Sequence, residues 1–377
     1  MIPLSVPHLA GNEWTYVKDC LDTGWISSVG SYVTAFENKV AEYTNRRFGV
    51  ACVNGTNGLH IALMINGVNR GDMVIVPNVT FVASLNAIKY AGADPILVDI
   101  DPDTWQMDID LLEVFLKVHT RVEKQDCIHK ETGKRIKAIM PVHVLGNIGD
   151  IRKLQELCTA YNLAMVEDAT EALGSWFNGK HAGTFGTTGV FSFNGNKIIS
   201  TGGGGVIVTD DEQLARKAKH LTTQAKVGDE YLHDDIGYNY RLVNVLAAIG
   251  LAQMELLPSF IEKKKNIDNY YRQQLTGIGD IKFQQVLPET DPNCWLFTLR
   301  TKKMRSLLEC LNNQAIQSRP FWVPMNQLQM FKDDMYVTRQ NHSRLIYEES
   351  ISIPCSTGIT QEQLETVSKA IRQFYTT

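Results

Sequence analysis

The chain has 377 residues and a net charge of −4, with 44% hydrophobic and 21% charged residues. This composition is typical of water-soluble enzymes, and no basic stripe suggests a nucleic-acid partner. No apolar run of about eighteen residues and no basic-then-apolar leader occurs, so we expect a cytoplasmic protein with no membrane span.

The first two-thirds of the chain alternate short apolar runs with amphipathic stretches. The strand-like runs are residues 74–76, 96–98, 136–142, 164–166, 189–193 and 206–208. Helical patterns lie between them, as at 57–67 and 151–161. This alternation predicts an α/β fold with a mostly parallel, doubly wound sheet. A polar stretch at 120–134 interrupts the pattern, and we expect an inserted hairpin or loop there.

The pattern changes after about Gly237. We expect an apolar helix at 246–261 that Pro258 breaks, then an amphipathic helix at 262–275. Strand-like pieces near 281–283 and 295–299 and closing helices near 305–314 and 361–375 follow. The sequence thus predicts a large domain, residues 1–245, and a smaller α+β C-terminal domain, residues 246–377.

Several common site motifs are absent. The glycine run Gly202 to Gly205 precedes a strand, whereas a dinucleotide fingerprint follows one. No P-loop, HExxH or GxSxG pattern occurs. The seven cysteines are odd in number and lack a CxxC spacing, which indicates free thiols in a reducing compartment. We therefore expect no metal site.

Three separate positions make chemical sense together. Asn54-Gly55-Thr56-Asn57 follows an apolar run and opens a helix, where backbone N–H groups and the helix dipole favour a phosphate, although such a turn is often only an N-cap. Asp168 ends a buried strand, at the edge of a parallel sheet where ligands bind, and a carboxylate there can keep a pyridine ring protonated. Its neighbour Glu167 is equally well explained as a cap of the next element.

Lys197 is the third position, in a loop that leads to the four glycines. Lysine forms Schiff bases with carbonyl groups, although an isolated lysine is normally a solvated side chain. A phosphate seat, a strand-end aspartate and a loop lysine are the three anchors of a pyridoxal phosphate site. They occur here in the order found in fold-type I aminotransferases, which this chain resembles.

The resemblance extends along nearly the whole chain and is to the DegT/DnrJ/EryC1/StrS sugar aminotransferases. The segments that carry it are Ile2-Pro3-Leu4-Ser5, Gly11-Asn12-Glu13, Gly24-Trp25, Asn54-Gly55-Thr56, Val76-Pro77, Thr80-Phe81, Val98-Asp99-Ile100-Asp101, Pro141-Val142-His143, Glu167-Asp168-Ala169, Phe191-Ser192-Phe193, Lys197 with Gly202 to Gly205, and Gly237-Tyr238-Asn239-Tyr240-Arg241.

The resemblance implies a role for each matching residue toward pyridoxal 5′-phosphate. Lys197 is the catalytic residue and holds the cofactor covalently, while Asp168 pairs with its pyridine nitrogen. Phe81 stacks on the ring, unless it is an ordinary core aromatic. The phosphate is held by residues of the helix start and of a strand end, namely Gly55, Thr56, Asn57 and Ser192. Asn239 reaches the cofactor of a partner subunit, so a homodimer with shared active sites is implied, whereas His143 has either a cofactor contact or a structural role.

Two positions depart from the family pattern. Glu171 stands where relatives have Gln or His near the phenolic oxygen of the cofactor, and a carboxylate there is repulsive unless protonated or turned away. Asn326 replaces a histidine that many relatives carry in the smaller domain. The roles of both residues are therefore open.

The implied reaction moves an amino group from glutamate to a nucleotide-linked keto-sugar. The resemblance favours C4 of a UDP-4-keto-6-deoxy-N-acetylglucosamine type of substrate, for the synthesis of glycan or surface-polysaccharide sugars. Alternatives are a GDP-perosamine synthase-like 4-aminotransferase and a C3 or cyclitol aminotransferase. From other classes, a non-catalytic regulator with this fold is opposed by Lys197 and Asp168, and a nicotinamide-dependent oxidoreductase is opposed by the missing fingerprint.

Overall fold

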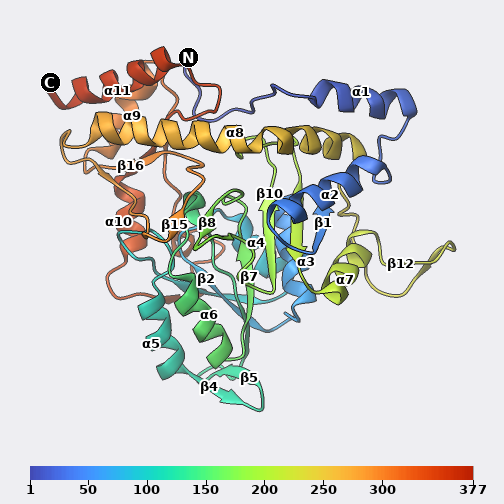
Figure 1. The fold of residues 1–377 in the computed structure, drawn as a ribbon. Coiled ribbons are helices and arrows are strands. Elements are labelled where there is room, and N and C mark those ends of the chain that lie inside the picture. Colours follow the sequence, from blue (N-terminus) through green and yellow to red (C-terminus); the bar gives the residue numbers. More distant parts are fainter. Residues whose placement is uncertain (377) are drawn as a thin grey trace.

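A ten-stranded sheet forms the centre of the computed structural model, which describes residues 1–376 (Figure 1). Its main strands follow the order β1-β11-β10-β7-β6-β2-β3-β18, and the strands from β10 to β18 are parallel to their neighbours. β11 is antiparallel to both β1 and β10. The prediction of a mostly parallel α/β sheet is confirmed. The strands are β1 (Phe48–Cys52), β2 (Met73–Pro77), β3 (Asp94–Val98), β4 (Thr120–Glu123), β5 (Asp126–His129), β6 (Arg135–Ile139), β7 (Ala164–Asp168), β10 (Thr188–Ser192), β11 (Gly205–Thr209) and β18 (Met335–Val337).

Helices cover both faces of this sheet because its strands are apolar on both sides; all five residues of β2 and of β11, for example, are buried. α3 contacts α4 and α7, while α5 and α6 pack together (Figure 1). The helices of this part are α1 (Glu13–Thr23), α2 (Ser31–Tyr43), α3 (Gly55–Ile65), α4 (Ala83–Tyr90), α5 (Ile109–His119), α6 (Ile151–Ala160) and α7 (Glu212–Thr222), with a short 3-10 turn η1 (Val144–Gly146).

A second hydrophobic core surrounds a four-stranded antiparallel sheet of order β14-β16-β19-β17. Its elements are β14 (Lys282–Phe283), β16 (Thr298–Arg300), β17 (Arg319–Pro320), β19 (Ser350–Ser352), α9 (Met304–Asn313) and α11 (Gln361–Thr376). The 3-10 turn η2 (Met325–Gln327) and α10 (His342–Glu349) lie in the same part of the chain, but their buried Met325 and Ile346 pack in the first core. Since β18 nevertheless joins the large sheet, the C-terminal third contributes to both sheets. The division of the chain near residue 245 stays a prediction.

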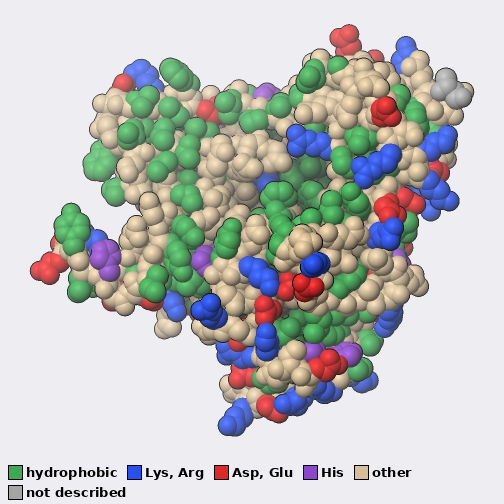
Figure 2. All heavy atoms as spheres, turned by 180° about the vertical axis from the view of Figure 1, so that it is seen from behind, with side chains coloured by type: hydrophobic (Ala, Val, Ile, Leu, Met, Phe, Trp, Pro, Cys, Tyr) green, Lys and Arg blue, Asp and Glu red, His purple; other side chains and the backbone are tan. Residues whose placement is uncertain are grey.

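Two small sheets and one inserted hairpin complete the fold. One three-stranded sheet consists of β8 (Trp176–Phe177), β9 (Lys180–His181) and β15 (Thr290–Asp291). The polar stretch at 120–134 contains the hairpin of β4 and β5, which pairs with β6, as predicted. A second hairpin, β12 (Lys226–Val227) with β13 (Leu232–His233), projects from the body as an arm, seen at the left in Figure 2.

α8 (Asn244–Leu275) corrects the sequence analysis, because it is one continuous helix and Pro258 does not break it. A proline removes one backbone hydrogen bond, but packing on both sides of Pro258 outweighs that loss. The first half of α8 packs on α1 and α2, and its second half contributes Tyr271 and Leu275 to the second core. Within residues 1–376, α8 is the one helix long and apolar enough to cross a membrane, and its burial is that of a core helix in a soluble protein.

Candidate active site

A cavity of about 490 Å³ lies where β7 and β10 end and α3 and α4 begin. Seven of the predicted site residues line it, which are Gly55, Thr56, Phe81, Asp168, Glu171, Ser192 and Lys197. Its position at the carboxyl ends of parallel strands is where ligands bind in open α/β sheets. Phe81 is 56% exposed, so its ring is a cavity wall and no part of the core.

The start of α3 forms one wall of this cavity. The Asn54 side chain caps the helix by accepting a hydrogen bond from the N–H of Asn57 at 2.8 Å. The first intrahelical hydrogen bond runs from the N–H of Gly58 to the carbonyl of Asn54, so the N–H groups of Gly55 and Thr56 have no partner within the helix. Two free donors at a helix N-terminus suit an anion such as phosphate.

Gly55 allows α3 to approach β10 closely. A Cβ atom at this position would lie 2.9 Å from Cβ of Ser192 and 3.1 Å from Cγ2 of Thr170. Any larger residue would therefore move the helix start away from the Ser192 hydroxyl.

Asp168 is the last residue of β7, and its carboxylate is fixed on both oxygens. The Ser84 hydroxyl donates to Oδ2 at 2.6 Å, and the Thr170 N–H donates to Oδ1 at 3.2 Å. Ser84 in turn contacts the Thr80 hydroxyl at 2.7 Å. The two donors hold the Asp168 carboxyl group in one orientation inside the cavity, as a fixed partner for a ligand nitrogen requires.

Lys197 lies on the connection between β10 and β11, with its side chain 13% exposed. Its Nζ is 3.8 Å from Oε1 of Glu171, whose Oε2 accepts a hydrogen bond from the N–H of Leu145 at 2.9 Å. Burial lowers the pKa of Lys197, against the attraction of Glu171 and Asp168. Burial also raises the pKa of Glu171 to about 7, although the charge of Lys197 opposes that rise. Burial therefore shifts Lys197 toward the neutral amine, the form of lysine that acts as nucleophile and base.

Trp295 covers the other side of Lys197. The Lys197 Nζ is 4.1 Å from the centre of the Trp295 ring, and the indole N–H donates to the carbonyl of Asn196 at 2.7 Å. The mouth of the cavity carries one more cation, Arg319, with the aromatic rings of Phe321 and Trp322 beside it.

Three predicted residues lie outside this cavity. His143 contacts Oε2 of Glu167 at 2.9 Å, and the backbone N–H groups of Gly183, Phe185 and Gly186 also donate to Glu167. Burial opposes ionisation of Glu167, but these hydrogen bonds keep its pKa below the usual range. The arrangement favours the structural alternative for His143. Asn57 lies in the first turn of α3, and Asn239 is exposed on the surface.

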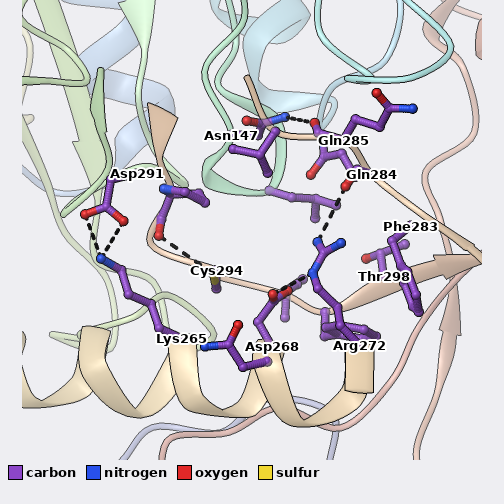
Figure 3. Close-up of a pocket in the computed structure, with 16 residues that line it drawn as sticks. Asn147, Lys265, Asp268, Arg272, Phe283, Gln284, Gln285, Asp291, Cys294 and Thr298 are labelled. Atoms are coloured by element: carbon purple, nitrogen blue, oxygen red, sulfur yellow. Dashed lines mark hydrogen bonds and ion pairs between the residues drawn. The ribbon is translucent and has the colours of Figure 1, made fainter. Parts of the chain in front are cut away.

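A second cavity of about 690 Å³ adjoins the first, and Leu145 and Leu296 line both (Figure 3). Its charged residues are already paired with each other. Lys265 points to Asp291, with Nζ and Oδ1 2.6 Å apart, and Arg272 points to Asp268, with Nε and Oδ2 also 2.6 Å apart (Figure 3). It contains none of the predicted site residues, seven of which line the smaller cavity. Within residues 1–376, no group of three or more His, Cys, Asp or Glu residues could hold a metal ion.

The sequence analysis missed Ser84 and Trp295. Ser84 follows the Thr80-Phe81 segment by one helical turn, so its position near Phe81 was a weak signal. Trp295 is 98 residues from Lys197 in the chain, and no motif connects the two.

Comparisons with known proteins agree with this arrangement. The family model described as the DegT/DnrJ/EryC1/StrS aminotransferase family matches residues 7–372. A similar protein of Escherichia coli O157:H7, named GDP-perosamine synthase, is 38% identical over 99% of this chain and 98% of its own. A second, of Caulobacter vibrioides and of the same name, is 36% identical over 99% and 98%. Among solved structures, a putative sugar aminotransferase from Streptococcus pneumoniae in its PLP form has a TM-score of 0.89 at 25% identity, covering 100% of this chain and 98% of that one.

Proposed function

Because this chain belongs to the DegT/DnrJ/EryC1/StrS aminotransferase family, we propose a specific reaction for it, the amination of C4 of a GDP-linked 4-keto-6-deoxy sugar with glutamate as donor. The chain is a fold-type I, pyridoxal-phosphate-dependent sugar aminotransferase. One observation carries the finer assignment, namely full-length similarity at 38% and 36% identity to two proteins named GDP-perosamine synthase. The GDP-linked alternative of the sequence analysis is thus better supported than the UDP-linked expectation.

The cavity fits pyridoxal phosphate. Unpaired N–H groups at Gly55 and Thr56, with the hydroxyl of Ser192, suit the phosphate. The fixed carboxylate of Asp168 suits the ring nitrogen, Phe81 offers a ring face, and Lys197 offers a buried amine. When bound, the cofactor supplies a carbonyl carbon that takes up the amino group and a ring that accepts electrons.

Protein side chains control the proton movements of the reaction. The neutral amine of Lys197 would remove the proton from the α-carbon of the donor amino acid and, once protonated, would deliver it to the carbon that took up the amino group. Asp168, held by Ser84 and by the Thr170 N–H, would pair with the ring nitrogen of the bound cofactor. Glu171 lies near enough to Lys197 to influence the proton on its amine.

The nucleotide sugar enters where Arg319, Phe321 and Trp322 line the cavity. An arginine is well suited to a diphosphate, because its planar group makes paired hydrogen bonds with phosphate oxygens. The half-buried Trp322 provides an apolar face for a sugar or base, whereas Phe321 is 3% exposed and supports Trp322 from the core. The rings of Phe321 and Trp322 are stacked on each other, with centroids 4.7 Å apart.

We further propose a cytoplasmic homodimer in which Asn239 of each subunit completes the site of the other. Large apolar side chains are exposed near α1, before α2 and on the arm, including Trp14 at 75%, Trp25 at 57% and Tyr231 at 95% exposed. In Figure 2, hydrophobic side chains gather on the left, the side from which the arm projects. Covering such a surface by a second copy is favourable because it removes apolar area from water.

The test is a comparison of two substrates with the purified protein, pyridoxal phosphate and glutamate. We expect mass spectrometry to detect amination of GDP-4-keto-6-deoxymannose in preference to UDP-4-keto-6-deoxy-N-acetylglucosamine. Exclusive amination of the UDP sugar would overturn the GDP assignment. Lys197→Ala should keep the fold, lose the near-visible absorbance of the bound cofactor and abolish turnover with either substrate.

A further inference from the structure

Trp295 makes two contacts with the loop that carries Lys197, although it belongs to a distant part of the chain. Its ring face lies over the amine, 4.1 Å from Nζ, and its indole N–H donates to the carbonyl of Asn196 at 2.7 Å. The first contact acts on the amine itself, and the second acts on the backbone immediately before it. Trp295 is 3% exposed, so its orientation is set by packing.

The backbone of Trp295 is held at both its polar groups. Its N–H donates to Oδ1 of Asn293 at 3.0 Å, and its carbonyl accepts from the buried Nζ of Lys264 on α8 at 2.8 Å. Cys294, between Asn293 and Trp295, has a φ of 54°, a left-handed conformation that is unfavourable for a non-glycine residue. A tightly fixed turn with local strain indicates that the direction of the Trp295 side chain is well determined.

The same turn is connected to the other neighbour of Lys197. The Asn293 side chain donates from Nδ2 to the carbonyl of Glu171 at 2.8 Å. Lys197 therefore lies between the carboxylate of Glu171 and the indole ring of Trp295, and Asn293 makes hydrogen bonds to the backbone of both residues. The other charged groups facing the cavity are Asp168 and Arg319.

An aromatic face attracts an ammonium group, and the attraction is strongest for tryptophan and for groups removed from water. A neutral amine has no such attraction. The ring is therefore selective for the protonated state of Lys197, at a place where burial alone favours the neutral one.

We propose that Trp295 is a positioning residue that holds the amine of Lys197 over its ring when that amine is detached from the cofactor and protonated. This inference rests on the proposed role of Lys197. Trp295 would hold the amine beside the reacting atoms between the two halves of the reaction. The hydrogen bond from its indole N–H to Asn196 would fix the position of the loop that carries Lys197.

The experiment uses the full-length enzyme loaded with pyridoxamine 5′-phosphate, in which Lys197 is free. The amine is modified with an amine-reactive anhydride across a pH series, and mass spectrometry of the Lys197 peptide gives the pH midpoint of the reaction. Trp295→Leu removes the ring face, and Trp295→Phe keeps a weaker face but loses the N–H donor. Trp176→Phe, at a half-buried tryptophan of the three-stranded sheet, is the matched control.

Substitution also changes water access, so ring-fluorinated tryptophan is the decisive comparison. Fluorination keeps the volume and the N–H group but weakens the negative charge of the ring face. We expect the midpoint for Lys197 to fall by about 0.5 to 1 pH unit in the fluorinated protein. Trp295→Leu should behave similarly, Trp295→Phe should shift less, and fluorination of the Trp295→Phe protein should add no shift.

An unchanged midpoint in the fluorinated protein would overturn the proposal, as would an equal shift in Trp176→Phe. The experiments distinguish a failure of the role proposed for Lys197 from a failure of the role proposed for Trp295. Turnover and near-visible absorbance that survive in Lys197→Ala would remove the role of Lys197 itself. If they are lost in Lys197→Ala while fluorination has no effect, only the role of Trp295 is wrong.

Discussion

The carboxylate of Glu171 and the amine of Lys197 lie 3.8 Å apart in a site where burial disfavours the charged form of each. Burial raises the pKa of Glu171 and lowers that of Lys197, so it shifts both groups toward their neutral forms. The sequence analysis anticipated that Glu171 would be repulsive beside the cofactor unless protonated. With a pKa raised to about 7, Glu171 carries a proton over much of the neutral range and can donate a hydrogen bond.

The raised pKa of Glu171 predicts a loss of stability as pH rises. The unfolded chain releases this proton near pH 4.5, whereas the folded protein keeps it until about pH 7. At Glu171 the folded state binds more protons in that window, so the contribution of this group to the free energy of unfolding falls across it. In Glu171→Gln the decline should be smaller by about 1 to 3 kcal/mol, as measured by urea unfolding of the cofactor-free protein at several pH values.

The lowered pKa of Lys197 has the opposite sign and acts at higher pH. There the unfolded chain binds the extra proton, so stability rises with pH toward the ordinary lysine value of 10.5. Between pH 4.5 and 7 the buried residues His60, His129 and His181, whose pKa values burial lowers, contribute with the sign opposite to that of Glu171, so it is the difference between Glu171→Gln and the parent that isolates Glu171. Glu156→Gln, at an exposed position of α6, is the control and should leave the slope unchanged. Equal slopes in Glu171→Gln and the parent would show that Glu171 titrates normally.

Ser84→Ala tests the support of Asp168. The substitution removes the 2.6 Å hydrogen bond to Oδ2 and leaves a buried carboxylate with one donor fewer. A hydrogen bond to a charged group contributes about 1.5 to 3 kcal/mol, which corresponds to a roughly 10- to 100-fold lower kcat if it acts on the chemical step. Thr80→Val acts one contact further away and should have a smaller effect. Wild-type kcat in Ser84→Ala would show that the bond only stabilises the fold.

Gly55→Ala tests the phosphate seat. The new methyl group would meet the Ser192 and Thr170 side chains at 2.9 and 3.1 Å, so the start of α3 must shift away from β10. We expect the dissociation constant of pyridoxal phosphate, measured by absorbance titration, to rise about 10-fold or more. Gly195→Ala is the matched control, because its methyl group would meet only Pro7, at 3.9 Å. Equal cofactor affinity in both variants would contradict this seat.

The sequence predicted those parts of the site that local chemistry determines. Asp168 and the Asn54-Gly55-Thr56-Asn57 segment adjoin apolar strands, so their place at the sheet edge follows from the alternation of strands and helices. Trp295 could not be found in this way, because its approach to Lys197 depends on how residues 293–295 turn between the two cores. The error at Pro258 has a similar cause, since a local breaker was given more weight than the packing that overrides it.

Mixing two inactive variants tests the proposed sharing of the site. Lys197→Ala removes the amine from its own subunit, and Asn239→Ala would damage the partner's site. A hybrid dimer of the two has one site with both defects and one site with neither. Random mixing of equal amounts should therefore restore about a quarter of the parental activity. No recovery after confirmed exchange of subunits would place Asn239 in the site of its own subunit.

Pro258→Ala examines the balance between local preference and packing in α8. Pro258 lies inside the helix, so it leaves the carbonyl one turn earlier without its usual donor, yet its own ring is exposed and fills no core space. Alanine restores that hydrogen bond, while the unfolded chain gains freedom that offsets part of the benefit. We expect a net stabilisation of about 1 to 2 kcal/mol, measured as a higher thermal midpoint at unchanged activity. Leu257→Ala, at the adjacent buried position, should instead destabilise by about 2 to 5 kcal/mol. A lower midpoint in Pro258→Ala would mean that the proline supports a bend of α8 between the two cores.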